Sequence, residues 1–368
     1  MEKTATKTSA FRYSRIEPAD YQKLIQSIDE ILCEGNSHNA GKYDLNHWYW
    51  QYLKLPSAKA FIYGVFDEND LLIGYYHIPC YTGHIGEKKV LIGMIQDVAI
   101  SQKSRGGGVF RQLAQYAHQD IAQEVDFIYT FPNHKSIHTF IKYNQYSLLK
   151  TLPAYILPIN AAKIIHSKLK IPLINHLATP FTFLHQKICQ VNVPKDYQFI
   201  FDHSLNLETE QLLKSFNALH RIGLDKNNQY IQWRFFDKPN SKHYLLKVIQ
   251  NQKLLAILVF KVDEMLGNPS LLLMDFAYIE TENHVLMALQ WLKDVGLSQI
   301  PESVNLLFTS GNSLIFNSLY KVGFVKIPNQ FSPRPLNLLT KNIRLTDCAN
   351  AIFDSNNWLI TLADWDVF

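Results

Sequence analysis

Residues 97–110 read DVAISQKSRGGGVF, an apolar run followed by a turn with three consecutive glycines. Because glycine has no Cβ, Gly106, Gly107 and Gly108 can adopt left-handed backbone angles and leave consecutive N–H groups pointing outward. Apolar residues then recur at three- and four-residue spacing: Val109, Leu113, Tyr116, Ala117 and Ile121. This spacing predicts a helix that begins after Gly108. A strand, a glycine turn and a helix N-terminus in this order predict a site suited to a phosphate.

Two other phosphate-binding turns are excluded, because the chain has neither GxxxxGK[ST] nor GxGxxG with an acidic residue at the right distance. A merely flexible glycine loop is the alternative. The turn resembles the acyl-CoA loop of the GNAT superfamily of N-acyltransferases, whose motif is Arg/Gln-x-x-Gly-x-Gly/Ala after a strand. The matching residues are Arg105, Gly106, Gly107, Gly108 and Val109. The last position departs from the motif, since Phe110 stands where the family usually has Gly or Ala.

A second stretch supports this resemblance. Residues 127–146, FIYTFPNHKSIHTFIKYNQY, resemble the next strand of the superfamily, its Asn-x-x-Ser/Ala helix and its closing FYxKxGF segment. Asn133 and Ser136 match the Asn-x-x-Ser part, and Phe140 matches the first Phe. The resemblance therefore implies that these three residues belong to the cofactor site.

The chain also repeats itself. Residues 50–65, WQYLKLPSAKAFIYGV, and 233–248, WRFFDKPNSKHYLLKV, share Trp, Pro, Lys and an aromatic residue at an offset of 183 (233 − 50). Further on, residues 96–99, QDVA, are echoed by residues 274–277, MDFA, and the stretch that ends at Tyr146 is echoed by one that ends at Phe324. Three echoes in the same order predict two GNAT-like domains in tandem.

The expected fold class is α+β, with each GNAT-like domain built as three αβα layers around a mixed, mostly antiparallel sheet. The expected parts are a GNAT domain with the acyl-CoA loop (1–158), a connector (159–195), a degenerate GNAT-like domain (196–330), and a C-terminal link and closing strand (331–368). The second domain is considered degenerate because YIETENHVLM follows Ala277 in place of the glycine loop. A backbone without glycine and with two added carboxylates disfavours a pyrophosphate.

Composition is consistent with a cytoplasmic enzyme. The net charge of +4 is spread along the 368 residues, which favours a polyanion such as CoA but is too weak to predict nucleic-acid binding. Four distant cysteines have no metal-ligand spacing, so we expect reduced thiols and no metal site. We expect no secretion signal and no membrane span. The oligomeric state is not predicted.

The resemblance implies a mechanism. In the superfamily, a bulge separates the strand that carries Val98, Ala99 and Ile100 from its neighbour, and the freed backbone amides bind the pantetheine arm. An amide near Ile100 would then hydrogen-bond the thioester carbonyl and stabilise the oxyanion. The implied reaction is direct transfer of an acetyl or other acyl group from acetyl-CoA to an amine.

The proton-transfer groups are candidates only. Asp97 is a possible general base, although a structural role is the alternative because Asp275 echoes it in the copy without the loop. The usual tyrosine acid of the superfamily falls on Ile141, so Tyr143 is the preferred acid. The chain resembles tandem GNAT enzymes of the enhanced-intracellular-survival type, which implies that the carboxylate of Phe368 is a second candidate base. Four histidines are weaker candidates: His77, His84, His134 and His138.

Three functions compete at this stage. The favoured one is an N-acetyltransferase that acts on a small-molecule amine such as an amino sugar. The second is an aminoacyl transferase related to tandem GNAT enzymes that modify peptidoglycan, although those enzymes do not need the CoA loop. The third is a non-catalytic CoA-binding or interaction module, which Ile141 supports.

Overall fold

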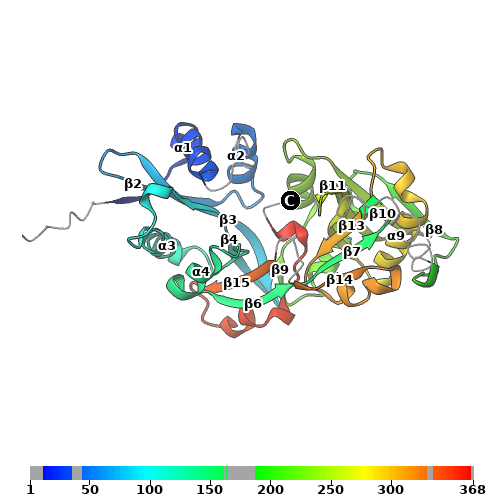
Figure 1. Cartoon of the computed structure of the whole chain (residues 1–368). Coiled ribbons are helices and arrows are strands. Elements are labelled where there is room, and N and C mark those ends of the chain that lie inside the picture. Colours follow the sequence, from blue (N-terminus) through cyan, green and yellow to red (C-terminus); the bar gives the residue numbers. More distant parts are fainter. Residues whose placement is uncertain (1–10, 35–43, 161–162, 165–186, 330–334, 366–368) are drawn as a thin grey trace, which may run out of the picture. The chain divides into compact units, whose positions relative to one another are not determined.

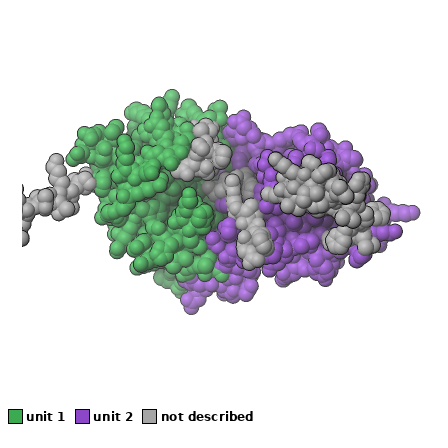
Figure 2. Space-filling view, viewed as in Figure 1, with its two compact units in different colours: residues 1–83, 89–149, 338–349 green, residues 84–88, 150–337, 350–368 purple. Residues whose placement is uncertain are grey.

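The computed structural model describes residues 11–34, 44–160, 163–164, 187–329 and 335–365. The chain forms two compact units, shown in green and purple in Figure 2. The first unit comprises residues 1–83, 89–149 and 338–349, and the second comprises residues 84–88, 150–337 and 350–368. None of the described helices is long and apolar enough to cross a membrane.

The first unit is built on a mixed sheet with the strand order β1-β2-β3-β4-β5-β15-β6. Its strands are β1 (Arg12–Arg15), β2 (Ala60–Phe66), β3 (Leu72–Ile85), β4 (Lys88–Ile100), β5 (Phe127–Thr130), β15 (Leu336–Asn342) and β6 (Ser147–Leu152). The pairs β1–β2, β2–β3 and β5–β15 are antiparallel, whereas β4 and β5 are parallel. The mixed, mostly antiparallel sheet expected from the sequence is confirmed.

Helices cover both faces of this sheet (Figure 1). They are α1 (Tyr21–Cys33), α2 (Leu45–Tyr52), α3 (Val109–Asp120) and α4 (Ile137–Asn144). Alternate residues of β2 divide between the faces: Phe61 and Tyr63 pack in the cluster that holds α3, and Ile62 packs with α1 and α2. This alternation follows from the two-residue period of a strand. The three-layer αβα arrangement is therefore confirmed.

The second unit has its own sheet, with the order β14-β7-β13-β12-β11-β10-β8. Its strands are β14 (Val325–Ile327), β7 (Ala154–Pro158), β13 (Leu306–Ser310), β12 (Asn268–Tyr278), β11 (Lys253–Met265), β10 (His243–Gln250) and β8 (Tyr197–Phe201). The short strand β9 (Ile222–Leu224) is not part of this sheet. Its helices include α7 (Leu207–Asn217), α8 (Asn228–Ile231) and α9 (Asn283–Asp294). As in the first unit, one pair, β12–β13, is parallel.

The two sheets repeat each other in detail at their parallel pairs. In the first, the Thr130 hydroxyl at the end of β5 donates to the Ile95 carbonyl on β4 (2.9 Å). In the second, the Thr309 hydroxyl on β13 donates to the Leu273 carbonyl on β12 (3.1 Å). Matched bonds at matched positions indicate that the sequence echoes mark two copies of one fold in tandem.

Each sheet is completed by a strand that is remote in sequence. Strand β15 lies between β5 and β6 in the first sheet, with Leu339 opposite Thr130. Strand β7 lies between β13 and β14 in the second, with Leu157 opposite Leu307. Leu339 and Leu157 are fully buried, so each of these strands belongs to the core of its sheet.

The fragment 1–158, the first domain as limited from the sequence, is expected to lose cooperative unfolding because it lacks β15. Without that strand the edge of β5 that faces away from β4 is unpaired, and β6 loses its neighbour in the sheet. Appending residues 335–349 through a flexible linker should restore a cooperative transition in urea followed by circular dichroism. A cooperative transition in the unsupplemented fragment would show that β15 is dispensable.

Candidate functional site

Strand β4 carries a bulge at Asp97, whose φ of 47° is left-handed and unusual for a residue inside a strand. The parallel pairing of β4 with β5 ends at Ile95 and Thr130, although β4 continues to Ile100. Within the described residues, no backbone hydrogen bond joins residues 98–100 to β5. The two strands thus form an open fork beyond Thr130, with Val98 and Ala99 partly exposed on it.

The glycine turn lies directly after this fork. Gly106, Gly107 and Gly108 have φ values of 92°, 57° and 80°, the left-handed angles expected from the sequence. All three are exposed, and their N–H groups find no acceptor among the described residues. The Arg105 Nε donates to the Ile100 carbonyl (3.0 Å), which ties the start of the turn to the end of β4.

Helix α3 begins at Val109, with Gly108 as its N-cap. The buried residues Val109, Leu113 and Ala117 hold its apolar face against the sheet, as the periodicity predicted. The Phe110 ring packs against Phe140 at a centroid distance of 5.5 Å, so its bulk is part of the core contacts of the helix. Exposed amides at a helix N-terminus attract an anion, because the helix dipole adds to their partial positive charge.

Asn133 and Ser136 build the turn that starts α4. The Asn133 Oδ1 accepts from the N–H groups of Lys135 (2.9 Å) and Ser136 (3.1 Å), and from the Ser136 hydroxyl (3.2 Å). Phe140, one turn further on, is buried against Phe110. The observed contacts of these residues are local, and their expected part in the cofactor site stays a prediction.

The candidate acid Tyr143 lies near the end of α4 and is exposed, as is Ile141. The Tyr143 ring contacts the His138 ring edge-on at 6.2 Å, and the Lys142 ammonium lies 5.4 Å from the Tyr143 ring centre. The C-cap of helix α4 is Gln145, which has a left-handed φ of 59°. In the second unit Gly323 is a left-handed C-cap in the same way (φ 103°). Phe368, the other proposed proton-transfer residue, lies outside the described residues.

A polar network that the sequence analysis missed lies beside the bulge. The Tyr52 hydroxyl on α2 donates to the Asp97 Oδ2 (2.5 Å) and also contacts the His77 Nδ1 (3.1 Å) and the Gln96 Nε2 (3.3 Å). Tyr52, His77 and Gln96 are buried, and Asp97 is partly exposed. Burial lowers the pKa of His77 to about 4, against an opposing effect of Asp97.

One sequence signal could have found Tyr52. At the offset of 183, Tyr52 corresponds to Phe235, so its hydroxyl occurs only in the copy that has the glycine turn.

The other three histidine candidates lie away from the Tyr52 network. His84 pairs with Asp225 (2.9 Å) in the second unit. His134, before α4, and His138, on α4, are exposed.

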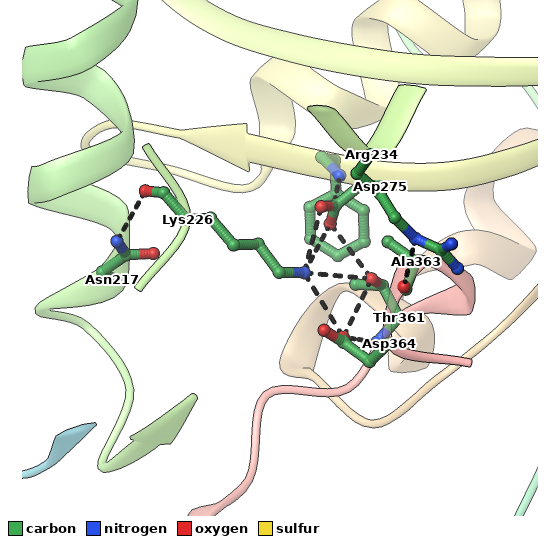
Figure 3. Close-up of polar contacts among 8 residues, drawn as sticks. Asn217, Lys226, Arg234, Asp275, Thr361, Ala363 and Asp364 are labelled. Atoms are coloured by element: carbon green, nitrogen blue, oxygen red, sulfur yellow. Dashed lines mark hydrogen bonds and ion pairs between the residues drawn. The ribbon is translucent and has the colours of Figure 1, made fainter. Parts of the chain in front are cut away.

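In the second unit, the corresponding fork is occupied by the chain itself. Asn312, just beyond β13, pairs with Ile360, and the Thr361 hydroxyl donates to Asp275 on β12 (3.0 Å). Figure 3 shows Lys226 reaching into this cluster, with its Nζ 3.0 Å from Asp275 and 3.3 Å from Asp364. The C-terminal segment 358–364 therefore contacts the ends of both strands.

The loop after β12 also differs from the glycine turn. Its left-handed residue is Glu280 (φ 64°), whose carboxylate pairs with Lys253 (2.8 Å). Without consecutive glycines, and with a carboxylate in the turn, this loop cannot offer an equivalent anion site. The second unit thus lacks the glycine turn, and its degenerate character stays a prediction.

Residues 12–144 match the family model of the acetyltransferase (GNAT) domain. No curated protein matches the chain. Among solved structures, the chain is similar to a conserved protein from Enterococcus faecalis described as a probable N-acyltransferase, with a TM-score of 0.63 and 10% identity, covering 91% of this chain and 73% of that one.

Two further structures share the fold. A GCN5-related N-acetyltransferase from Anabaena variabilis has a TM-score of 0.59 at 12% identity, covering 91% of this chain and 73% of that one. The N-myristoyltransferase of Saccharomyces cerevisiae, solved with myristoyl-CoA, has a TM-score of 0.58 at 11% identity, covering 92% of this chain and 84% of that one. At these identities the likeness establishes the shared fold alone.

Lowering the pH is expected to destabilise the first unit through His77. The unfolded imidazole takes up a proton near pH 6.5, whereas the folded one stays neutral down to about pH 4. The stability of the parent is therefore unaffected by His77 above pH 6.5 and falls as the pH is lowered to 4, by on the order of 3 kcal/mol in the free energy of unfolding. Between pH 7 and pH 4.5, His77→Val should lose less of its free energy of unfolding in urea than the parent does. Equal losses would contradict this.

Proposed function

We propose that this chain, whose residues 12–144 form a GNAT acetyltransferase domain, transfers an acetyl group from acetyl-CoA to the amine of a small molecule such as an amino sugar. One observation carries the proposal: three left-handed, exposed glycines with unused N–H groups lie between an open strand fork and a helix N-terminus. A pyrophosphate and an extended pantetheine arm need this combination of donors.

The donor site is proposed to extend over both features. The turn from Arg105 to Phe110 would hold the pyrophosphate, and the free backbone edge of Val98, Ala99 and Ile100 would pair with the pantetheine. Asn133, Ser136 and Phe140 would form the opposite wall, at the start of α4. The turn is uncharged apart from Arg105, so backbone N–H groups would supply most of the attraction.

The reaction would be a direct transfer. The amine nitrogen attacks the thioester carbonyl carbon, a C–N bond forms, and the C–S bond breaks with the electron pair leaving on the CoA sulfur. A backbone N–H near Ile100 would stabilise the oxyanion of the tetrahedral intermediate. Asp97 or the Phe368 carboxylate would accept the proton of the amine, and Tyr143 would protonate the departing thiolate.

Ile141 favours a second candidate function. It is exposed where the superfamily commonly has its tyrosine acid, and its side chain has no proton to give. A non-catalytic domain that binds CoA for structural or regulatory purposes would tolerate this residue. Binding of acetyl-CoA with no release of free CoA in the presence of any amine would support that second function.

Calorimetric titration is expected to show one acetyl-CoA per chain for the parent and about tenfold or weaker affinity for Gly107→Ala. An added Cβ disfavours the left-handed angle, so the turn relaxes and its N–H groups lose their direction. Gly86→Ala is the matched control, because Gly86 has nearly the same φ (59° against 57°) and equally open surroundings in the β3–β4 hairpin. Equal affinity of Gly107→Ala and the parent, or no binding by the parent, would contradict the proposed donor site.

Tyr143→Phe is expected to lower kcat by about a hundredfold, because the thiolate would lose its acid, with little change in KM. The measurement is the release of free CoA from acetyl-CoA with glucosamine and other amines. Tyr320→Phe serves as control, since Tyr320 is an exposed tyrosine of the second unit. Extending the chain by a few residues beyond Phe368 tests the terminal carboxylate in the same assay, and unchanged turnover would remove it as the base.

A further inference from the structure

The Asp97 carboxylate accepts a hydrogen bond from the uncharged hydroxyl of Tyr52. The Tyr52 hydroxyl carries one proton, and its 2.5 Å contact with the Asp97 Oδ2 shows that this proton points to the carboxylate. The oxygen of Tyr52 must then accept from its other neighbours, the Gln96 amide (3.3 Å) and the His77 Nδ1 (3.1 Å). The contacts therefore select the His77 tautomer that carries its proton on Nδ1.

The rings around His77 fix that imidazole. It stacks on Tyr75 at a centroid distance of 4.9 Å and meets Trp48 and Tyr52 edge-on at 5.0 and 5.1 Å. His77 is fully buried, and its Nε2 has no hydrogen-bond partner among the described residues. A buried polar ring that makes one directed bond and leaves another unmade is costly, so packing alone gives no reason for it.

The second unit offers an internal comparison. Tyr52 corresponds to Phe235 at the offset of 183. His77 lies opposite Ile62 on β2, and the residue opposite the corresponding Leu245 is Val259. Both polar side chains are thus replaced by apolar ones in the copy that lacks the glycine turn, while the aspartate remains as Asp275.

Asp275 is held in a different way. Its carboxylate contacts the Lys226 Nζ at 3.0 Å and the Thr361 hydroxyl at 3.0 Å, and it is almost completely buried. Figure 3 shows the lysine and the C-terminal segment converging on this aspartate. A lysine neutralises the carboxylate with which it pairs, whereas a tyrosine hydroxyl orients a carboxylate and leaves the net charge of the site unchanged. Asp97 is also partly exposed, whereas Asp275 is buried.

We infer that Tyr52 and His77 are positioning residues for the proposed acyl transfer: the Tyr52 hydroxyl orients the Asp97 carboxylate toward the fork, and the buried His77 imidazole fixes that hydroxyl. The inference rests on the proposed function and selects Asp97 as the group that takes the proton of the amine. Tyr52 and His77 do not contact the substrate, and the proton moves from the amine nitrogen to an Asp97 oxygen. Other titratable side chains near this face include Tyr75 on β3, and Tyr21, Asp29 and Cys33 on α1.

The test uses substitutions that the second unit already carries. Tyr52→Phe and His77→Val copy Phe235 and Val259, and His77→Asn keeps an N–H donor close to the position of Nδ1. With acetyl-CoA and the best amine of a panel that starts with glucosamine, Tyr52→Phe should lower kcat about ten- to hundredfold, and the KM for acetyl-CoA should change by less than about twofold. His77→Val should lower kcat in the same way, and His77→Asn should recover most of it.

The pH profile of kcat/KM separates positioning from a structural role. Tyr52→Phe should move its acidic limb, because the carboxylate loses a hydrogen bond that favours its charged form. Adding Tyr52→Phe to Asp97→Asn should cause no further loss, since the two residues act as one unit. Acetyl-CoA calorimetry and thermal unfolding of each variant control for binding and folding.

Three outcomes overturn the inference and remain distinguishable. If the parent transfers the acetyl group but Tyr52→Phe keeps kcat and the acidic limb of the profile, the positioning role fails and the proposed function stands. If the parent binds acetyl-CoA but transfers the acetyl group to no amine, both the positioning role and the proposed function fail. A loss in Tyr52→Phe that is additive with Asp97→Asn would also exclude action through Asp97.

Discussion

The hydrogen-bonded pairing of β4 with β5 stops at Ile95 and Thr130, and the open backbone edge of the first unit depends on that stop. A parallel pair that continued to Ile100 would use its backbone groups within the sheet and leave none for a ligand. Asp97, with its left-handed backbone, lies just beyond the last pair, and the Thr130 hydroxyl donates to the Ile95 carbonyl at that pair. The glycine turn follows the end of β4. One local irregularity thus places a backbone edge, a helix N-terminus and a carboxylate next to each other.

In the second unit the corresponding fork is closed by the chain itself. The Thr309 hydroxyl donates to the Leu273 carbonyl, as Thr130 does to Ile95 in the first unit. Beyond this bond, Ile360 pairs with Asn312, and the Thr361 hydroxyl donates to Asp275. The buried Lys226 offsets part of the negative charge of Asp275 and Asp364, which is why two carboxylates can share a dry site. A polypeptide segment and its ion pairs thus lie where the first unit has an open fork.

Each sheet contains one strand from a remote part of the sequence. Strand β15 lies inside the first sheet and β7 inside the second, so the loss of either half of the sequence would remove an interior strand from the sheet of the other half. Leu338, Leu339 and Thr340 are fully buried in the first unit, although they lie about two hundred residues from their β5 partners in sequence. The first sheet therefore requires residues near the C-terminal end of the chain, which a fragment limited to residues 1–158 lacks.

The sequence by itself determined the features that depend on a few neighbouring residues. Glycine at three successive positions permits the left-handed angles at 106–108, the spacing from Val109 to Ala117 identifies the buried face of α3, and the echo at an offset of 183 reveals the tandem fold. Only the tertiary structure decided which strand enters each sheet, because backbone hydrogen bonds are the same for every residue type and do not specify a partner. It also decided that Tyr52 lies on Asp97, since this contact depends on how a helix packs across two strands rather than on local sequence.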